Sequence, residues 1–160
     1  MTQHKVPIGF IIAGNQPSSA EAELQQEGIR SIVNLRLPHE ESEGLNPDQE
    51  SRLAAELGLA FVHLPIAAEK LSEMDVQALQ DVIAALPAPV YVHCGLGQRA
   101  ATLSLLASAD SGTSAVRIVK QAEAGGIDIS PAVHDFIARY LESRKTEREE
   151  DEISFYRAVR

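Results

Sequence analysis

The chain is poor in the residues that mark disulfide-stapled and aromatic-rich proteins. It has no tryptophan, four phenylalanines, three tyrosines and a single cysteine among 160 residues. One cysteine cannot form an internal disulfide, so the composition fits a reducing compartment. The core must come from aliphatic residues instead. Hydrophobic residues make up 44% of the chain, which is enough for one domain.

Long apolar runs and positive charge are also scarce. The apolar run near the N-terminus, IGFIIAG at 8–14, is short for a signal peptide and too short to span a membrane. Lysine and arginine total 14 against 23 aspartates and glutamates, giving a formal net charge of −9. This excess disfavours binding to nucleic acids and to anionic membranes. We therefore expect a cytoplasmic protein without nucleic-acid or membrane partners, and its oligomeric state is left open.

Apolar, β-branched segments alternate with segments of helical periodicity. Strands are predicted at 8–14, 29–36, 60–66 and 89–94, and helices at about 18–28, 47–57, 71–86, 98–109, 113–126 and 130–145. This alternation predicts an α/β domain with a mainly parallel sheet of four to five strands and helices on both faces. We assign residues 1–145 to a single domain. Residues 146–160 form a charged tail whose first half is expected to be a solvated helix extension or disordered.

The single cysteine lies in the segment VYVHCGLGQR at 90–99, where a strand ends and a helix begins. Gly95 and Gly97 permit tight turning of the backbone, and successive N–H groups in such a loop form an anion-binding nest. The N-terminus of the following helix adds partial positive charge, and Arg99 adds a planar fork for two oxygens. A lone buried cysteine is usually a small core residue, but this combination favours a thiolate nucleophile in an oxyanion cradle.

The residues of the loop and the polar residues near it have the following expected roles. Cys94 is the predicted nucleophile, and His93 is expected to orient the loop by hydrogen bonding. Arg36, at the end of another strand, either borders the site or pairs with a loop glutamate. The other histidines have no partners at metal-ligand spacing, so we expect neither a metal nor an organic cofactor. The predicted phosphate-binding residues are Gly95, Leu96, Gly97, Gln98 and Arg99.

His93, Cys94, Gly97 and Arg99 resemble the phosphate-binding loop of cysteine-dependent tyrosine and dual-specificity phosphatases. In that signature five residues separate the cysteine from the arginine, whereas here there are four. The four-residue spacing is similar to that of rhodanese-type sulfurtransferases. It is also similar to that of the bacterial phosphatase-like family known as DUF442, the phosphatase-like domain of beta-lactamase hydrolase-like proteins.

Three further segments resemble the bacterial family, and the resemblance spans about residues 8–142. They are AGNQPSSAEAELQQEGIRSIVNLR, GLAFVHLPI and AVRIVKQAEAGGIDI. A rhodanese is expected to carry Asp-Val-Arg and Gly-His-Ile-Pro-Gly-Ala segments upstream, and the chain has neither. The resemblance implies the three-layer sandwich of the cysteine phosphatases.

The chain departs from the phosphatases at two points. Ala100 follows the arginine, where many phosphatases have the serine or threonine that helps the thiol leave the phosphoenzyme. Ala67 and Ala68 stand where related phosphatases carry the aspartate that acts as general acid, and Glu69 is the nearest carboxylate. Glu69 is therefore the candidate acid, although an exposed loop charge is the more ordinary role for such a residue.

The resulting expectation is a phosphatase that hydrolyses a phosphate monoester, on a protein or a small molecule, through a phosphocysteine intermediate. Two alternatives stay open at this point. Cys94 carries a persulfide in a rhodanese-like sulfurtransferase, or the cradle binds phosphate without chemistry.

Overall fold

The sheet has five strands in the order β1-β2-β5-β3-β4. They were located in a computed structural model that describes residues 3–17, 20–40 and 44–159. The strands are β1 Lys5–Ile8, β2 Ile11–Gly14, β3 Ser31–Asn34, β4 Ala60–His63 and β5 Val90–His93. Strand β1 pairs antiparallel with β2, and the other pairings are parallel. The predicted, mainly parallel sheet is therefore confirmed.

The first predicted strand is wrong in one respect, because the run at 8–14 contains a reverse turn. Gly9 has a φ of 59°, in the left-handed region, and Phe10 beside it is exposed. The chain turns at these two residues, and Ile8 then faces Ile11 across an antiparallel hairpin. No polar turn residue interrupts the apolar run, so the pattern alone reads as one strand.

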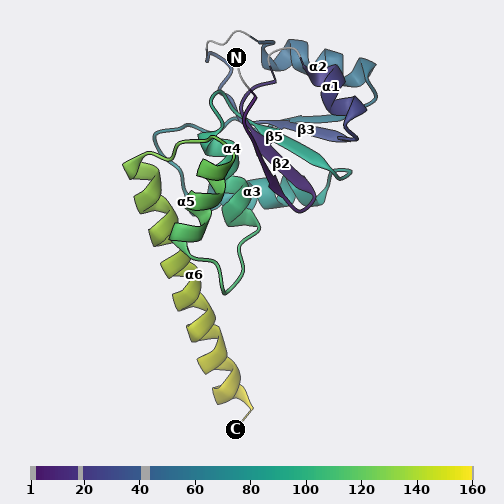
Figure 1. Cartoon of the computed structure of the whole chain (residues 1–160). Coiled ribbons are helices and arrows are strands. Elements are labelled where there is room, and N and C mark those ends of the chain that lie inside the picture. Colours follow the sequence, from purple (N-terminus) through teal and green to yellow (C-terminus); the bar gives the residue numbers. More distant parts are fainter. Residues whose placement is uncertain (1–2, 18–19, 41–43, 160) are drawn as a thin grey trace.

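Helices cover both faces of the sheet, as Figure 1 shows. Helices α1 and α2 lie on one face, and α3 to α6 lie on the other. Their bounds are α1 Glu21–Gln26, α2 Pro47–Glu56, α3 Glu73–Ala84, α4 Gln98–Ala107, α5 Ala115–Ala124 and α6 Pro131–Ala158. The predicted three-layer sandwich is confirmed.

Alternate residues of β5 supply the two cores. Tyr91 packs with the residues under α1 and α2, while Val90 and Val92 belong to the larger core under the other helices. All three are buried, as expected for a central strand covered on both faces. Helix α4 is the most enclosed helix, since its residues 99–106 are all buried. This burial fixes the helix whose first turn adjoins Cys94.

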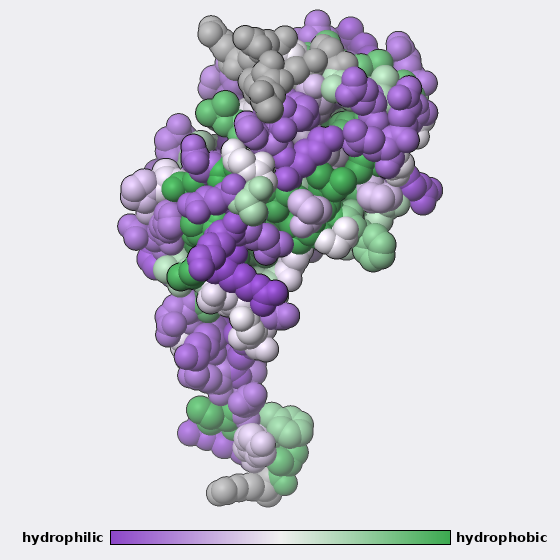
Figure 2. All heavy atoms as spheres, viewed as in Figure 1, coloured by the Kyte–Doolittle hydropathy of each residue, from purple (hydrophilic) through white to green (hydrophobic). Residues whose placement is uncertain are grey.

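Helix α6 continues through the predicted tail and projects from the body of the protein (Figure 1). Its buried residues end at Tyr140, and residues 144–158 are exposed. Figure 2 shows a hydrophilic surface along this projection, with hydrophobic side chains again at its far end, where Ile153, Phe155 and Tyr156 lie. The tail is thus a solvated helix extension. In the ranges given above, no helix is long and apolar enough to cross a membrane.

The parallel register brings four strand ends to one edge of the sheet. Gly14 and Asn34 are both paired with His93, and Asn34 is also paired with His63. The residues that follow these positions therefore emerge side by side. In open α/β sheets this carboxyl edge is where ligands bind.

Candidate functional site

A cavity of about 900 Å³ opens at this edge, with Cys94 in its wall. The cavity mixes apolar surface with four groups that carry or can carry charge besides the cysteine, namely His4, Glu40, Arg99 and Asp128. The remaining lining residues are Gln16, Ala68, Gly95, Leu96, Gln98, Gly126, Ile129 and Ser130. Four of the five predicted phosphate-binding residues thus line it, and the fifth, Gly97, is buried and does not line it.

The loop after β5 holds the cysteine sulfur against the start of α4. Cys94 is 1% exposed, and its Sγ accepts a hydrogen bond from the Gly97 N–H at 3.2 Å. Gly97 is the N-cap of α4 and has a φ of 100°. A Cβ there would lie 2.9 Å from Ile127 Cδ1 and 3.2 Å from the Asn15 nitrogen. Both the backbone angle and the space therefore require glycine.

The rest of the loop is tied to its neighbours from both sides. The Gln16 N–H donates to the Gly95 carbonyl at 3.1 Å. The Ser130 N–H donates to Gln98 Oε1 at 2.6 Å, which joins the start of α4 to the loop before α6. The Leu96 side chain, in contrast, is 78% exposed at the mouth of the cavity. The loop is anchored at its base and apolar at its tip.

Arg99 is clamped by a residue from the loop after β3. Its Nη1 and Nη2 donate to the two carboxylate oxygens of Glu40 at 2.5 and 2.8 Å, and Nη1 also donates to the Ile66 carbonyl at 2.9 Å. A guanidinium has five N–H bonds. These three contacts do not involve the Nε–H or the second Nη2–H, and the guanidinium also forms a hydrogen bond with the Cys94 side chain.

The Glu40–Arg99 pair keeps both groups charged. The hydrogen bond from Arg99 lowers the pKa of Glu40, against the opposing effect of partial burial. Burial opposes the charge on Arg99, but the hydrogen bond to Glu40 and the nearby Cys94 sulfur outweigh it and raise the pKa of the guanidinium. The cavity therefore keeps a fixed cation beside the sulfur.

Arg36 does not line the cavity but holds the loop that carries Glu40. Its guanidinium donates to the backbone carbonyls of Leu45 at 2.9 Å and Glu40 at 2.7 Å. The side chain is buried, and His63 contacts the Arg36 carbonyl at 2.6 Å. Arg36 thus acts on the site through the backbone of a loop glutamate.

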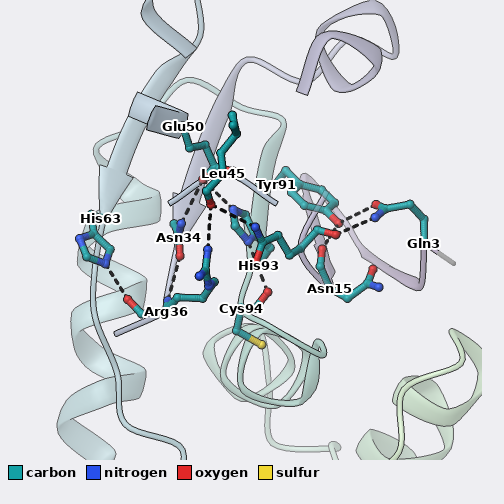
Figure 3. Close-up of polar contacts among 11 residues, drawn as sticks. Gln3, Asn15, Asn34, Arg36, Leu45, Glu50, His63, Tyr91, His93 and Cys94 are labelled. Atoms are coloured by element: carbon teal, nitrogen blue, oxygen red, sulfur yellow. Dashed lines mark hydrogen bonds and ion pairs between the residues drawn. The ribbon is translucent and has the colours of Figure 1, made fainter. Parts of the chain in front are cut away.

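His93 lies behind the loop in a buried polar network (Figure 3). Its Nε2 is 2.8 Å from Glu50 Oε1, which also accepts from Asn34 Nδ2 at 3.2 Å. The other ring nitrogen, Nδ1, is 3.4 Å from the Cys94 carbonyl. Figure 3 shows the His93 and Cys94 side chains pointing to opposite sides of the chain. The predicted orienting role of His93 therefore acquires a partner, Glu50 on α2.

Residues 10–124 match the family model of the phosphatase-like domain of beta-lactamase hydrolase-like proteins. The chain belongs to this family. It is 34% identical to the beta-lactamase hydrolase-like protein of Xylella fastidiosa (strain Temecula1) over 120 aligned residues. This alignment covers 74% of the chain and 28% of the Xylella protein. It is 35% identical to the beta-lactamase hydrolase-like protein of Agrobacterium fabrum over 102 residues, which are 63% of this chain and 23% of the Agrobacterium protein. The chain thus spans about a quarter of the length of these relatives.

Solved structures share the fold of this phosphatase-like domain. The nma1982 protein of Neisseria meningitidis Z2491 matches with a TM-score of 0.75 and 21% identity, over 84% of this chain and 96% of that one. The catalytic domain of the PP-IP phosphatase SIW14 from S. cerevisiae matches with a TM-score of 0.66 and 16% identity, over 89% and 90%. A variant of P. aeruginosa TpbA in complex with pTyr matches with a TM-score of 0.59 and 13% identity, over 88% and 86%.

The predicted acid of this phosphatase-like domain lies at the edge of the site. Glu69 is exposed in the turn after β4; its neighbour Ala68 lines the cavity, but Glu69 does not. Ala100, after the arginine, is fully buried in α4. Within the described ranges no three His, Cys, Asp or Glu side chains form a group that could hold a metal ion.

Sequence reasoning missed the acidic residues that hold this site together. Glu40 lies 59 positions before Arg99, and Glu50 lies 43 positions before His93. Asp128 in the cavity wall was also missed as a site residue. The available signal was positional, since Glu40 follows a strand that ends at the same sheet edge as Cys94.

Proposed function

We propose that this domain is a cysteine-dependent phosphatase that hydrolyses a phosphate monoester through a phosphocysteine intermediate. One observation carries the proposal. The Cys94 sulfur lies in a cavity wall at the N-terminal end of a buried helix, with a backbone N–H donating to it and a guanidinium beside it. These groups favour an incoming oxyanion next to the sulfur for electrostatic reasons.

In the first step the Cys94 thiolate attacks phosphorus, an S–P bond forms and the ester P–O bond breaks. The Nε–H and Nη2–H edge of Arg99 binds two equatorial oxygens in place of the hydrogen bond between the guanidinium and the Cys94 sulfur, while Glu40 holds the other edge. The N–H groups of residues 95–99 stabilise the charge that develops on phosphorus oxygens. In the second step a water attacks phosphorus, the S–P bond breaks, and the thiolate and inorganic phosphate are released.

The leaving oxygen needs a proton unless it is a stable anion. Glu69 remains the proposed donor from the turn beside Ala68, and the carboxyl group of Asp128 enters the same cavity from the loop before α6. Glu40 is a poor donor, because its bond to Arg99 keeps it ionised. The buried Ala100 offers no hydroxyl to the departing thiolate, so we expect slow breakdown of the phosphocysteine.

The charge of the cavity supports a substrate with one phosphate group on an uncharged body. Arg99 is the permanent cation in its wall, and Glu40 and Asp128 are carboxylates. A polyphosphorylated body would meet these carboxylates, and His4 is the one other described lining residue that can carry a positive charge. The apolar Leu96 and Ile129 at the wall suit an aryl or alkyl group instead.

The experiment that tests the proposal is hydrolysis of p-nitrophenyl phosphate by the parent protein and Cys94→Ser. We expect slow release of phosphate, loss of activity in Cys94→Ser, and inhibition by vanadate, which mimics the five-coordinate transition state. Trapping of 32P on the parent protein but not on Cys94→Ser identifies the intermediate. Activity that survives in Cys94→Ser would refute the proposal.

The four-residue spacing between Cys94 and Arg99 favours one second candidate, a sulfurtransferase. Thiosulfate would transfer its outer sulfur to Cys94 with loss of sulfite, and cyanide would then remove that sulfur as thiocyanate. Thiocyanate production without phosphate release would place this activity first.

A further inference from the structure

Two buried acids behind the cysteine loop have no part in the steps above. Glu50 on α2 and Glu21 at the start of α1 both have 0% exposure. Buried carboxyl groups are costly unless they are paired or neutral, so each needs a physical account.

Glu50 is satisfied at only one of its oxygens by the groups already described. Its Oε1 accepts from Asn34 and His93, whereas its Oε2 has no N–H or hydroxyl donor among the described residues. Neither oxygen of Glu21 has a donor from another described residue, and the only N–H that interacts with the carboxyl group is its own backbone N–H. The two carboxyl groups lie within hydrogen-bonding reach of each other. Two carboxylates cannot bond to one another, but a carboxylic acid donates to a carboxylate.

We propose that Glu21 is a carboxylic acid that donates its O–H to Glu50 Oε2, and that this shared proton makes Glu21 and Glu50 positioning residues for the Cys94 loop. The chain of contacts runs from Glu21 to Glu50 and from Glu50 to His93. His93 precedes the cysteine directly and contacts its carbonyl (Figure 3). The proton removes the repulsion that would otherwise push Glu50 away from His93.

The electrostatics of the pair agree with this assignment. Burial, the hydrogen bond with Glu50 and its charge together raise the pKa of Glu21 to about 7. Burial opposes the charge on Glu50, but the hydrogen bond from His93 outweighs it and lowers the pKa of Glu50. One acid therefore keeps a proton at a pH where the other is ionised.

The polar groups that face the pair come from strands β3 and β5. Strand β3 supplies Asn34, and β5 supplies His93 and the phenol of Tyr91. The Tyr91 hydroxyl donates to the Asn15 carbonyl on the other side of β5 and stays neutral, because burial raises its pKa. Arg36 is turned to the carbonyls of Glu40 and Leu45 instead. Among these neighbours, the hydrogen bonds to the pair come from Asn34 and His93.

The direct test is the titration of the glutamate carboxyl carbons by NMR in protein labelled with ¹³C at Cδ. We expect one glutamate to titrate near neutral pH, and its signal to be absent in Glu21→Gln. If all glutamate carboxyls titrate at the ordinary value of about 4.3, the assignment is wrong. This measurement on the parent protein does not depend on activity or on the folding of a variant.

The functional test compares pH profiles of kcat/KM for p-nitrophenyl phosphate in the parent and in Glu21→Gln. The amide keeps a neutral donor to Glu50 at every pH. We expect the ratio of variant to parent to rise with pH, by up to about tenfold for each pH unit above the Glu21 midpoint, because a single proton is lost. Glu23→Gln, an exposed change on the same helix, is the control and should give a flat ratio.

The two tests separate this inference, whose functional part rests on the proposed function, from that function itself. If the parent releases no phosphate, the phosphatase proposal fails, and the rate of Cys94 alkylation by iodoacetamide against pH replaces kcat/KM as the measure of loop position. A flat ratio of Glu21→Gln to parent in either assay would overturn the positioning role.

Discussion

The substitution Glu40→Gln distinguishes two roles for the Glu40 carboxylate that binds Arg99, which we call a clamp and a plug. In the clamp, Glu40 fixes one end of the guanidinium so that the other edge meets phosphate. In the plug, Glu40 competes with phosphate for Arg99. Both hydrogen bonds from Arg99 to Glu40 are charge-assisted, at 2.5 and 2.8 Å. The Glu40 side chain is 23% exposed and the Arg99 side chain is 10% exposed.

The expected size of the effect follows from these contacts. Breaking a fully buried pair by removing one partner costs about 3–5 kcal/mol, and a pair at the surface is worth about 0–1 kcal/mol. With partial exposure we take about 2 kcal/mol, which corresponds to about a thirtyfold fall in kcat/KM if Arg99 loses its position in the transition state. The fall in kcat/KM should appear with p-nitrophenyl phosphate as the substrate. The matched control is Glu56→Gln, a change at an exposed glutamate on α2, which should leave kcat/KM unchanged.

Unfolding measured against pH adds a second readout. The pKa of Glu40 is lowered in the folded protein, so its contribution to stability is present above the ordinary carboxyl range and is lost as pH falls through the folded value. Glu40→Gln should therefore be less stable than the parent near neutral pH, and the difference should shrink on acidification. A kcat/KM above that of the parent would identify a plug, and one within twofold of the parent would refute both roles.

Four further outcomes are expected. Arg99→Lys should keep the fold and lower kcat/KM by about tenfold or more, since lysine loses the two-pronged edge; equal values would remove Arg99 from the reaction. Glu69→Gln should slow aryl phosphates with poor leaving groups most, and a uniform effect would exclude it as the acid. Asp128→Lys should raise kcat/KM for pyrophosphate relative to p-nitrophenyl phosphate by about threefold or more at low salt, unlike the control Asp135→Lys; an unchanged ratio would refute the charge argument. As pH rises from 4.5 to about 7, the parent should lose up to about 3 kcal/mol of stability that Glu21→Gln keeps, because the raised Glu21 pKa stabilises the folded parent only while the acid is protonated. Free energies of unfolding that change in parallel with pH in the two proteins would refute this.

The sequence predicts those parts of the site that are contiguous along the chain. Cys94, the two glycines and Arg99 lie within six positions, and each contributes through its own backbone or side chain. The strand-to-helix junction that carries them is also local. For the same reason the helix after Asn46 begins where its capping box and proline place it.

The remaining parts depend on which strands lie side by side. The contact of Glu40 with Arg99 exists because β3 and β5 are neighbours in register, and one isolated sequence carries no signal for that pairing. The hairpin at Gly9 was hidden for another reason, because its turn residues are themselves apolar and extend the hydrophobic run. The charged tail was predicted from composition, but its full helical length was not.

The close packing around Gly97 limits how the sequence of this loop can diverge. A Cβ on residue 97 would have to displace the Ile127 side chain or the Asn15 backbone, and the φ of 100° would strain any residue other than glycine. A second mutation at Ile127 can relieve only the first of these constraints. Divergence of this loop should therefore spare Gly97 even in relatives whose residue at position 127 is smaller.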